Sequence, residues 1–242
     1  VYASGLFHED PQEYVREALY YKSRGINCYK AHPSGPCELD MEIHENIRKA
    51  VGPVMKLMSD PVAEYTLEEA VRVGRHLEKL GYEWLEEPFR DFELNKYTQL
   101  CAALDIPIAA TETTRGCHWG VAQVINQKAA DIVRADVSWK SGVTGTLKIA
   151  HLAESFGMQC EIHTTTMNYM DLVNLHVSCA IRNCRYFEYF VPEEDFMFPM
   201  KGLLPIDEKG IITVPDKPGI GGELDWELIE RNCVSHQMEV LE

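Results

Sequence analysis

The stretch Tyr82-Glu83-Trp84-Leu85-Glu86-Glu87-Pro88 is a short aromatic and apolar run that ends in two carboxylates and a proline. A similar strand-like run lies on either side of it along the chain, and each of these also ends in an acid. Asp60, Glu86 and Glu112 thus follow one another at intervals of 26 residues. That interval fits one strand, one helix and two loops, so the sequence predicts three acids that recur once per βα unit.

In a closed parallel barrel, the C-terminal ends of successive strands lie side by side at one rim, where barrel enzymes carry their chemistry. Three carboxylates at that rim would repel one another unless a divalent cation lay between them, and a site with oxygen ligands alone suits Mg²⁺. A single acid after a strand is usually a solvated loop residue. Three acids at equal spacing predict a Mg²⁺ site formed by Asp60, Glu86 and Glu112.

The size and composition of the chain favour one α/β barrel. A length of 242 residues fits one such barrel or two small domains, and the hydrophobic share of 45% allows a large core. The formal net charge of −15 argues against nucleic acids and anionic membranes as partners. Eight scattered cysteines without a C-x-x-C pair, no opening secretory signal and no apolar run of about 18 residues predict a reduced, cytoplasmic protein without a membrane span.

Strand-like and helical patterns alternate along the chain, which is typical of a parallel sheet. The repeats are more numerous than a doubly wound open sheet would need, which favours a barrel. Asp10 is expected to cap the first helix, and Thr66 to form a capping box with Glu69. The expected strands lie at 1–5, 26–32, 55–60, 82–86, 106–112, 131–136, 158–163 and 185–189, and the expected helices at 11–25, 41–51, 66–81, 97–104, 120–129, 147–156, 171–180 and 226–231.

An ionisable residue is expected at the inward-facing end of seven successive strands. Because side chains alternate across a strand, Glu86 shares a face with Trp84, whereas Glu87 points the other way and is expected to support the site rather than to bind metal. The same alternation places Ala110 on the inward face with Glu112. The seven predicted strand-end residues are His32, Asp60, Glu86, Glu112, Asp136, His163 and Glu188.

Two of the nine histidines lie at these strand ends, and they are the candidate acids and bases. Asp136 ends the strand before His163, so its carboxylate can hold one nitrogen of the imidazole and make the other nitrogen more basic. Lys30 lies beneath His32 on the same face, where its ammonium would lower the pKa of the histidine or neutralise nearby carboxylates. Glu188, if protonated or in a short hydrogen bond, could stabilise a developing oxyanion opposite the metal.

Arg134 and Glu161 are predicted to face the barrel interior on neighbouring strands, one inward position below the rim. An unpaired charge would be costly there, so we expect these two side chains to form an ion pair.

With these positions assigned, the sequence resembles the barrel domain of the enolase superfamily, in its mandelate racemase and muconate lactonizing enzyme subgroup. The resemblance rests on the stretch that ends in Pro88, the evenly spaced acids, the segment 142–145 between the sixth and seventh strands, and Pro218-Gly219-Ile220-Gly221. It implies a modified (β/α)7β barrel, a fold that the family covers with an N-terminal α+β capping domain. We expect residues 1–242 to be one barrel domain without that cap, with residues 192–242 packed on the barrel or on the cap.

The resemblance also implies a chemistry. Members of the family bind Mg²⁺ through three strand-end acids, hold a substrate carboxylate there and remove the adjacent α-proton. Asp60, Glu86 and Glu112 would then bind Mg²⁺, and Asp136 and His163 would form an acid/base pair, with Glu188 facing the carboxylate. The family usually has Lys-x-Lys on the strand that corresponds to residues 26–32. Here that motif reads Lys30-Ala31-His32, so His32 takes the place of the second lysine.

The function that this pattern favours is dehydration of a sugar acid to a 2-keto-3-deoxy acid. A racemase or epimerase and a cycloisomerase remain open, because two candidate bases would flank the substrate. Alternatives of other classes are a barrel that binds metal without turnover and, less favoured because the triad holds no histidine, a zinc hydrolase. The expected partners are a small carboxylate substrate, a capping domain and further copies of the chain in a homo-oligomer.

Overall fold

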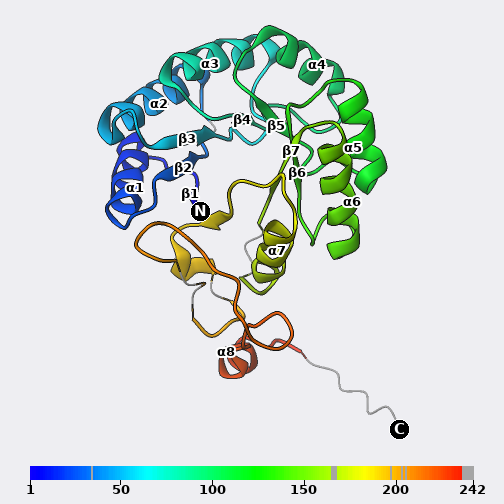
Figure 1. Ribbon diagram of the computed structural model, residues 1–242. Coiled ribbons are helices and arrows are strands. Elements are labelled where there is room, and N and C mark those ends of the chain that lie inside the picture. The colour runs from blue at the N-terminus through cyan, green and yellow to red at the C-terminus, as the bar shows by residue number, and fades with distance from the viewer. Residues whose placement is uncertain (34, 165–167, 197, 203, 205, 236–242) are drawn as a thin grey trace.

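The structure, a computed structural model, describes residues 1–242 except 34, 165–167, 197, 203, 205 and 236–242. Eight parallel strands form one sheet in the order β7-β6-β5-β4-β3-β2-β1-β8, and the helices lie around its outside (Figure 1). The strands are β1 Tyr2–Ser4, β2 Cys28–Ala31, β3 Lys56–Ser59, β4 Leu85–Glu86, β5 Ile108–Ala110, β6 Ile132–Ala135, β7 Gln159–Ile162 and β8 Glu188–Phe190.

The helices alternate with these strands as the sequence predicts. They are α1 Pro11–Ser23, α2 Cys37–Val51, α3 Leu67–Leu80, α4 Leu94–Ala103, α5 Cys117–Asn126, α6 Gly142–Ser155, α7 Asn168–Ala180 and α8 Trp226–Arg231, with a short 3₁₀ helix η1 at Glu193–Phe196. The Asp10 side chain caps α1, and Thr66 and Glu69 form the predicted capping box of α3.

The sheet curls into a nearly closed barrel. Each strand pairs in parallel with the next along the chain, and β1 also pairs with β8. Within the described residues no strand ladder joins β7 to β8. That seam is spanned instead by single contacts, such as the hydrogen bond of 2.8 Å from Cys160 N to Asn183 O. The expected TIM-type barrel is therefore confirmed.

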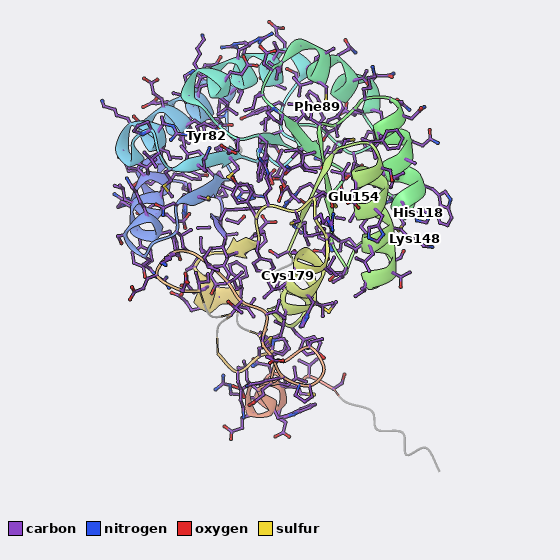
Figure 2. All side chains as sticks on the ribbon, viewed as in Figure 1. Tyr82, Phe89, His118, Lys148, Glu154 and Cys179 are labelled. Carbon is purple, nitrogen blue, oxygen red and sulfur yellow. The ribbon has the colours of Figure 1, made fainter. Side chains whose placement is uncertain are left out.

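The barrel interior changes character from one end to the other. An apolar group that includes Tyr2, Met58, Trp84 and Ala109 fills its lower part, and buried charged side chains lie above it. The outward faces of the strands pack on the helices, with Tyr82 and Phe89 among the buried side chains there (Figure 2). Charged groups are thus gathered at the C-terminal ends of the strands, above a packed apolar base.

The segment after β8 leaves the barrel and ends in α8, which projects below it in Figure 1. Isolated bridges join Met200 to Leu224 and Ile206 to Ile212. The backbone nitrogen of Val1 donates to the carbonyl of Gly210 at 2.7 Å, which ties this segment to the barrel. No separate α+β domain lies among the described residues. The helices of that same part of the chain are all too short or too polar to cross a membrane.

Candidate active site

Three carboxylates meet at the C-terminal rim of the barrel. Asp60 follows β3, Glu86 ends β4 and Glu112 follows β5, and one oxygen from each lies within 4.8 Å of the others. Oxygens that bind one Mg²⁺ at about 2.1 Å are at most about 4.2 Å apart, so a small movement of side chains would bring all three onto one ion. The residues predicted to bind the metal are therefore brought together by the fold.

The charge of this group also suits a divalent cation. Burial raises the pKa of Glu112 to about 8; the His163 imidazole lowers it, whereas the Glu86 and Asp60 carboxylates add to the rise. Burial raises the pKa of Glu87 to about 8 as well, and the Asp60 carboxylate adds to that rise. Raised pKa values mean that burial and neighbouring carboxylates disfavour ionisation of these groups, and a bound Mg²⁺ would favour the ionised form by supplying positive charge.

Local backbone geometry orients the acids. Trp84 Nε1 donates to Glu86 Oε2 at 2.8 Å, as expected for two residues on one face of a strand. The backbone of Glu87 is left-handed, with φ of 39°, and Glu87 Oε1 accepts a hydrogen bond of 3.0 Å from Glu112 N. The Glu87 carboxylate therefore holds the backbone of Glu112, the third acid of the triad. This contact agrees with the supporting role predicted for Glu87.

The expectation that Ala110 and Glu112 share the inward face of β5 is wrong. Ala109 faces the barrel interior, and Ala110 packs outward. Glu112 still reaches the rim because Thr111 has a left-handed backbone, with φ of 87°, which breaks the alternation. The Thr111 hydroxyl exchanges hydrogen bonds of 2.8 and 3.0 Å with the backbone of Arg134 and holds this kink in place.

Lys30 lies beneath the triad and is completely buried. Its ammonium is 2.7 Å from Glu188 Oε1, 3.0 Å from Glu86 Oε1 and 3.4 Å from Asp60 Oδ2. Burial alone would lower the pKa of Lys30, but Glu188 and Glu86 raise it well above its usual value. Lys30 is therefore a fixed positive charge, and its contacts favour the neutralising role among the two that the sequence left open.

The predicted ion pair between Arg134 and Glu161 is wrong. Arg134 Nε lies 2.7 Å from Glu86 Oε1, and Nη2 lies 2.5 Å from Glu188 Oε2. Glu161 contacts Arg134 through its backbone carbonyl oxygen, 3.3 Å from Nη1, and not through its carboxylate. The Glu161 carboxylate turns instead to the chain before β8, where it accepts hydrogen bonds of 3.2 Å from the amides of Arg185 and Tyr186. The long arginine side chain reaches up to the carboxylates near the rim. Its partner is therefore not the residue opposite it on the neighbouring strand.

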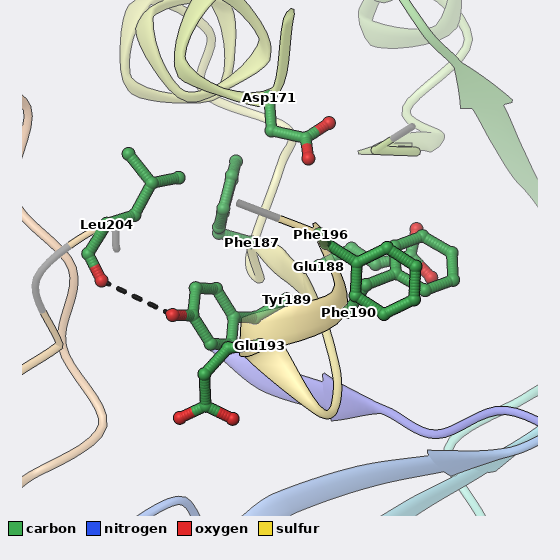
Figure 3. Close-up of a pocket in the computed structure, with 8 residues that line it drawn as sticks. All are labelled: Asp171, Phe187, Glu188, Tyr189, Phe190, Glu193, Phe196 and Leu204. Carbon is green, nitrogen blue, oxygen red and sulfur yellow. Dashed lines mark hydrogen bonds between the residues drawn. The ribbon is translucent and has the colours of Figure 1, made fainter. Parts of the chain in front are cut away.

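Glu188 begins β8 rather than ending it, contrary to the prediction. The next inward residue, Phe190, occupies the rim, and Figure 3 shows Tyr189 on the opposite side of the strand from Glu188 and Phe190. Burial alone would raise the pKa of Glu188, but Lys30 and Arg134 lower it well below its usual value. An ionised carboxylate has no proton to donate, so the structure does not support Glu188 as a protonated donor to an oxyanion.

His163 follows β7 and makes the predicted contact with Asp136. Its Nδ1 lies 2.8 Å from Asp136 Oδ2, and its Nε2 lies 3.4 Å from Glu112 Oε1. Burial alone would lower the pKa of His163, but the Glu112 carboxylate and the hydrogen bond with Asp136 raise it. With a proton held between Nδ1 and Asp136, Nε2 is the nitrogen that faces the site.

His32 lies beside another corner of the triad. Its Nδ1 is 2.5 Å from the carbonyl oxygen of Gly5, which can only accept, so Nδ1 carries a proton. Its Nε2 lies 3.3 Å from Asp60 Oδ2. The two candidate histidines therefore contact different acids of the triad: His32 contacts Asp60, and His163 contacts Glu112.

A pocket of about 390 Å³ opens over these groups. This volume is in the range of small-molecule sites. The pocket is lined by five of the predicted site residues, Lys30, His32, Asp60, Glu112 and His163, and by Glu87, for which the sequence predicted a supporting role. The other lining residues were not singled out by the sequence: Val62, Ala63, Phe89, Arg90, Asp91, Phe92, Thr113 and Phe190. Most of these residues follow strand ends. Phe190 lies two residues after Glu188 and so shares its face of β8, and this alternation is the only sequence signal that could have identified Phe190 as a lining residue.

A parallel barrel with three acids at its C-terminal rim defines an α/β-barrel protein of the kind that carries its chemistry at that rim. The chain belongs to the enolase superfamily, because the family model described as "Enolase C-terminal domain-like" matches residues 13–228. The resemblance drawn from the sequence motifs is thereby confirmed.

Relatives within this superfamily differ in the reaction they are named for. Arabinonate dehydratase of Saccharolobus solfataricus is 32% identical over 225 residues, which cover 91% of this chain and 60% of that protein. D-galactarolactone cycloisomerase of Agrobacterium fabrum is 26% identical, over 93% of this chain and 62% of its own. The crystal structure of D-glucarate dehydratase from Agrobacterium tumefaciens, complexed with magnesium, matches with a TM-score of 0.87 and 36% identity, over 96% of this chain and 64% of that one. The chain thus spans somewhat under two thirds of the length of these relatives.

Proposed function

We propose that this protein removes the proton next to the carboxylate of a sugar acid in a Mg²⁺-dependent reaction, and that loss of a β-hydroxyl then gives a 2-keto-3-deoxy acid. The observation that carries the proposal is that Asp60 and Glu112 line one pocket with His163 and His32, while the Glu86 carboxylate lies close enough to both acids to share a metal ion with them. Two of the relatives described above are named as sugar-acid dehydratases, which supports the same reaction class.

Asp60, Glu86 and Glu112 would hold the metal, and bound Mg²⁺ would supply the positive charge that stabilises the extra negative charge on the substrate carboxylate. Lys30 holds two of these acids in place from below. Asp136 keeps the proton on Nδ1 of His163. Nε2 of His163 is therefore available as the base toward the pocket.

In the proposed reaction, Nε2 of His163 accepts the α-proton. The electron pair of the broken C–H bond forms a carbon–carbon double bond and expels the β-hydroxyl group. His32, whose Nε2 lies 3.3 Å from Asp60 Oδ2, donates the proton that turns this hydroxyl into water. The enol that remains takes up a proton at the β-carbon and loses the proton of its enol hydroxyl, which gives the 2-keto-3-deoxy acid.

A screen of sugar acids against the whole gene product tests this proposal, with semicarbazide detecting the 2-keto acid. We expect activity with Mg²⁺, none after EDTA treatment, and a loss on the order of 10²- to 10⁴-fold in His163→Asn. Glu112→Gln should abolish both turnover and the heat of Mg²⁺ binding in titration calorimetry, whereas the exposed control Glu68→Gln should change neither. A protein that binds Mg²⁺ but turns over no acid sugar in the screen would contradict the proposal and favour the non-catalytic alternative.

A second candidate reaction, epimerisation or cycloisomerisation, is favoured by the approach of two histidines to different members of the triad. One histidine would take the α-proton and the other would deliver a proton, without net loss of water. Incubation in D₂O separates the two reactions. An epimerase returns substrate that contains deuterium and has inverted configuration, whereas a dehydratase gives the 2-keto-3-deoxy acid.

A further inference from the structure

Trp139 is a large aromatic residue that remains 51% exposed although it lies beside the candidate base. It belongs to the turn that follows β6 and stacks on the imidazole of His163, with ring centroids 4.7 Å apart and an angle of 30° between the planes. The imidazole itself is almost completely covered, since His163 is only 6% exposed. The indole therefore covers one face of the histidine ring while its own outer face remains in solvent.

The turn that carries Trp139 is held firmly at several points. Its start is fixed by Asn174, whose Oδ1 accepts a hydrogen bond of 3.1 Å from Val137 N. The carbonyl of Asp136 accepts hydrogen bonds from Trp139 N at 3.2 Å and from Lys140 N at 2.9 Å. The buried ammonium of Lys140 donates to the Thr114 carbonyl, which ties the turn to the loop after β5. An exposed tryptophan on such a turn has a defined position before any ligand arrives.

The same turn also supplies the partner of Nδ1 of His163, the carboxylate of Asp136. One hydrogen bond at one edge of a ring leaves the ring free to rotate about that bond. A stacking contact on the ring face removes this freedom. Phe190 limits it further through an edge-to-face contact, with ring centroids 6.3 Å apart and an angle of 82° between the planes. Edge and face contacts together keep Nε2 directed toward Glu112 and the pocket.

We propose that Trp139 is a positioning residue that fixes the plane of the His163 imidazole, so that Nε2 points at the substrate position, and that shields the ring face from water. Its catalytic consequence rests on the proposed function, whereas the fixing of the ring does not. Trp139 is not among the described residues that line the pocket, so it acts through His163 and not by touching the substrate. Holding a reacting group in the right orientation is worth a large factor in rate, because small misplacements are expensive.

The chain offers a matched control in Trp119. This residue is 70% exposed on α5 and packs against His118, with ring centroids 3.9 Å apart and the planes tilted by 32°, and neither residue is among the described residues that line the rim pocket. Figure 2 shows His118 at the outer edge of the molecule. Trp119→Ala thus removes an exposed indole that contacts a histidine outside the pocket lining, and Trp139→Phe keeps an aromatic ring at the tested position.

Proton NMR of the imidazoles tests the fixing of the ring without any need for turnover. The His163 signals are assigned by their loss in His163→Asn. In Trp139→Ala we expect the His163 ring-carbon proton to move downfield, because it loses the ring current of the indole, and the Nδ1 proton to broaden through exchange with water. Trp119→Ala should leave both signals unchanged. Unchanged His163 signals in folded Trp139→Ala would overturn the proposal.

Kinetics then test the consequence for the reaction. We expect Trp139→Ala to lower kcat on the order of 10- to 100-fold with little change in KM, and Trp139→Phe to restore most of the loss. A change in KM alone would show contact with the substrate and would overturn the positioning role. If no sugar acid is turned over at all, the proposed function fails, while the NMR comparison still decides whether Trp139 fixes the imidazole.

Discussion

Arg134 is a completely buried cation between two carboxylates that belong to different parts of the site. Its guanidinium contacts Glu86 at 2.7 Å and Glu188 at 2.5 Å, and Lys30 contacts the same two acids. Buried charges are tolerated only when they are paired, and the loss of one partner leaves the others without compensation. The charged layer under the rim therefore depends on this arginine.

Arg134→Met is expected to lower the free energy of unfolding by about 3–5 kcal/mol in Mg²⁺-free buffer, because it leaves two buried carboxylates with one cation. Adding Glu188→Gln to this variant should restore part of the loss. Arg185→Met is the control: this arginine pairs with Glu161 but is 44% exposed, so the cost should be no more than about 1 kcal/mol. Urea unfolding measures all three variants, and equal losses for the two arginine variants would contradict the argument.

The sequence predicts the residues of the site better than their contacts. Even spacing identifies Asp60, Glu86 and Glu112, because the period of the βα unit brings every strand end to the same rim. Alternation fails at Thr111, because no signal in the sequence marks a threonine with a left-handed backbone. The partner of Arg134 could not be predicted either, since a long flexible side chain reaches several acids and three-dimensional distance decides among them.

Glu193 joins η1, on the segment after β8, to helix α1 at the start of the chain. Its Oε2 accepts a hydrogen bond of 2.7 Å from the Tyr21 hydroxyl, and the Arg24 guanidinium contacts Oε1. Burial alone would raise the pKa of Glu193, but the hydrogen bonds from Tyr21 and Arg24 lower it below its usual value of 4.5. The ionised form is therefore favoured by folding.

Glu193→Gln is expected to lower the free energy of unfolding by about 1–3 kcal/mol at neutral pH, since the amide is a weaker acceptor and carries no charge. A lowered folded-state pKa means that this contribution is complete above pH 4.5 and is lost as the pH falls through the folded-state pKa. The difference between wild type and variant should thus be constant from about pH 8 to 5.5 and shrink below about pH 4.5.

Unfolding by urea at a series of pH values measures this difference. Glu194→Gln, at the exposed neighbouring residue, is the control and should change stability by less than about 0.5 kcal/mol at every pH. A Glu193→Gln effect that persists unchanged at pH 3 would show that the carboxylate charge is not involved.

Helix ends could be predicted where side chains make the cap. Thr66 and Glu69 are an example, and the predicted start of α3 agrees with the structure. Helix α6 begins at Gly142, five residues before its predicted start, after Ser141, whose backbone is left-handed and whose side chain makes no capping hydrogen bond. Such a start depends on backbone conformation and on packing against neighbouring elements, which a sequence pattern of polar caps does not reveal.

The barrel as a whole is closed by two kinds of contact. Among the described residues, backbone ladders join seven neighbouring pairs of strands, whereas the seam between β7 and β8 combines single backbone hydrogen bonds with hydrogen bonds to side-chain carboxylates. Glu161 from β7 accepts from the amides of Arg185 and Tyr186, and Thr164 N donates to Glu188 Oε2 at 3.2 Å. The regular repeat of the sequence predicts the ladders. It does not predict the seam, because isolated contacts there, including those of specific carboxylates, take the place of a regular ladder.

Glu161→Leu is expected to weaken this seam and with it the barrel, because two partly buried hydrogen bonds from backbone amides lose their acceptor, at a cost of about 0.5–1.5 kcal/mol each. Glu161→Gln keeps an acceptor oxygen of the same reach, so its cost should stay below about 1 kcal/mol. Burial raises the pKa of Glu161, although hydrogen bonds from the Tyr186 and Arg185 amides lower it. The neutral amide of the glutamine variant avoids the cost of burying a negative charge at neutral pH. Urea unfolding gives the two stabilities, and hydrogen exchange should show faster exchange of the amides of 185–186 and of β8 in the leucine variant only. If Glu161→Leu is as stable as Glu161→Gln and its amides exchange equally slowly, the seam does not depend on this carboxylate and backbone packing alone closes the barrel.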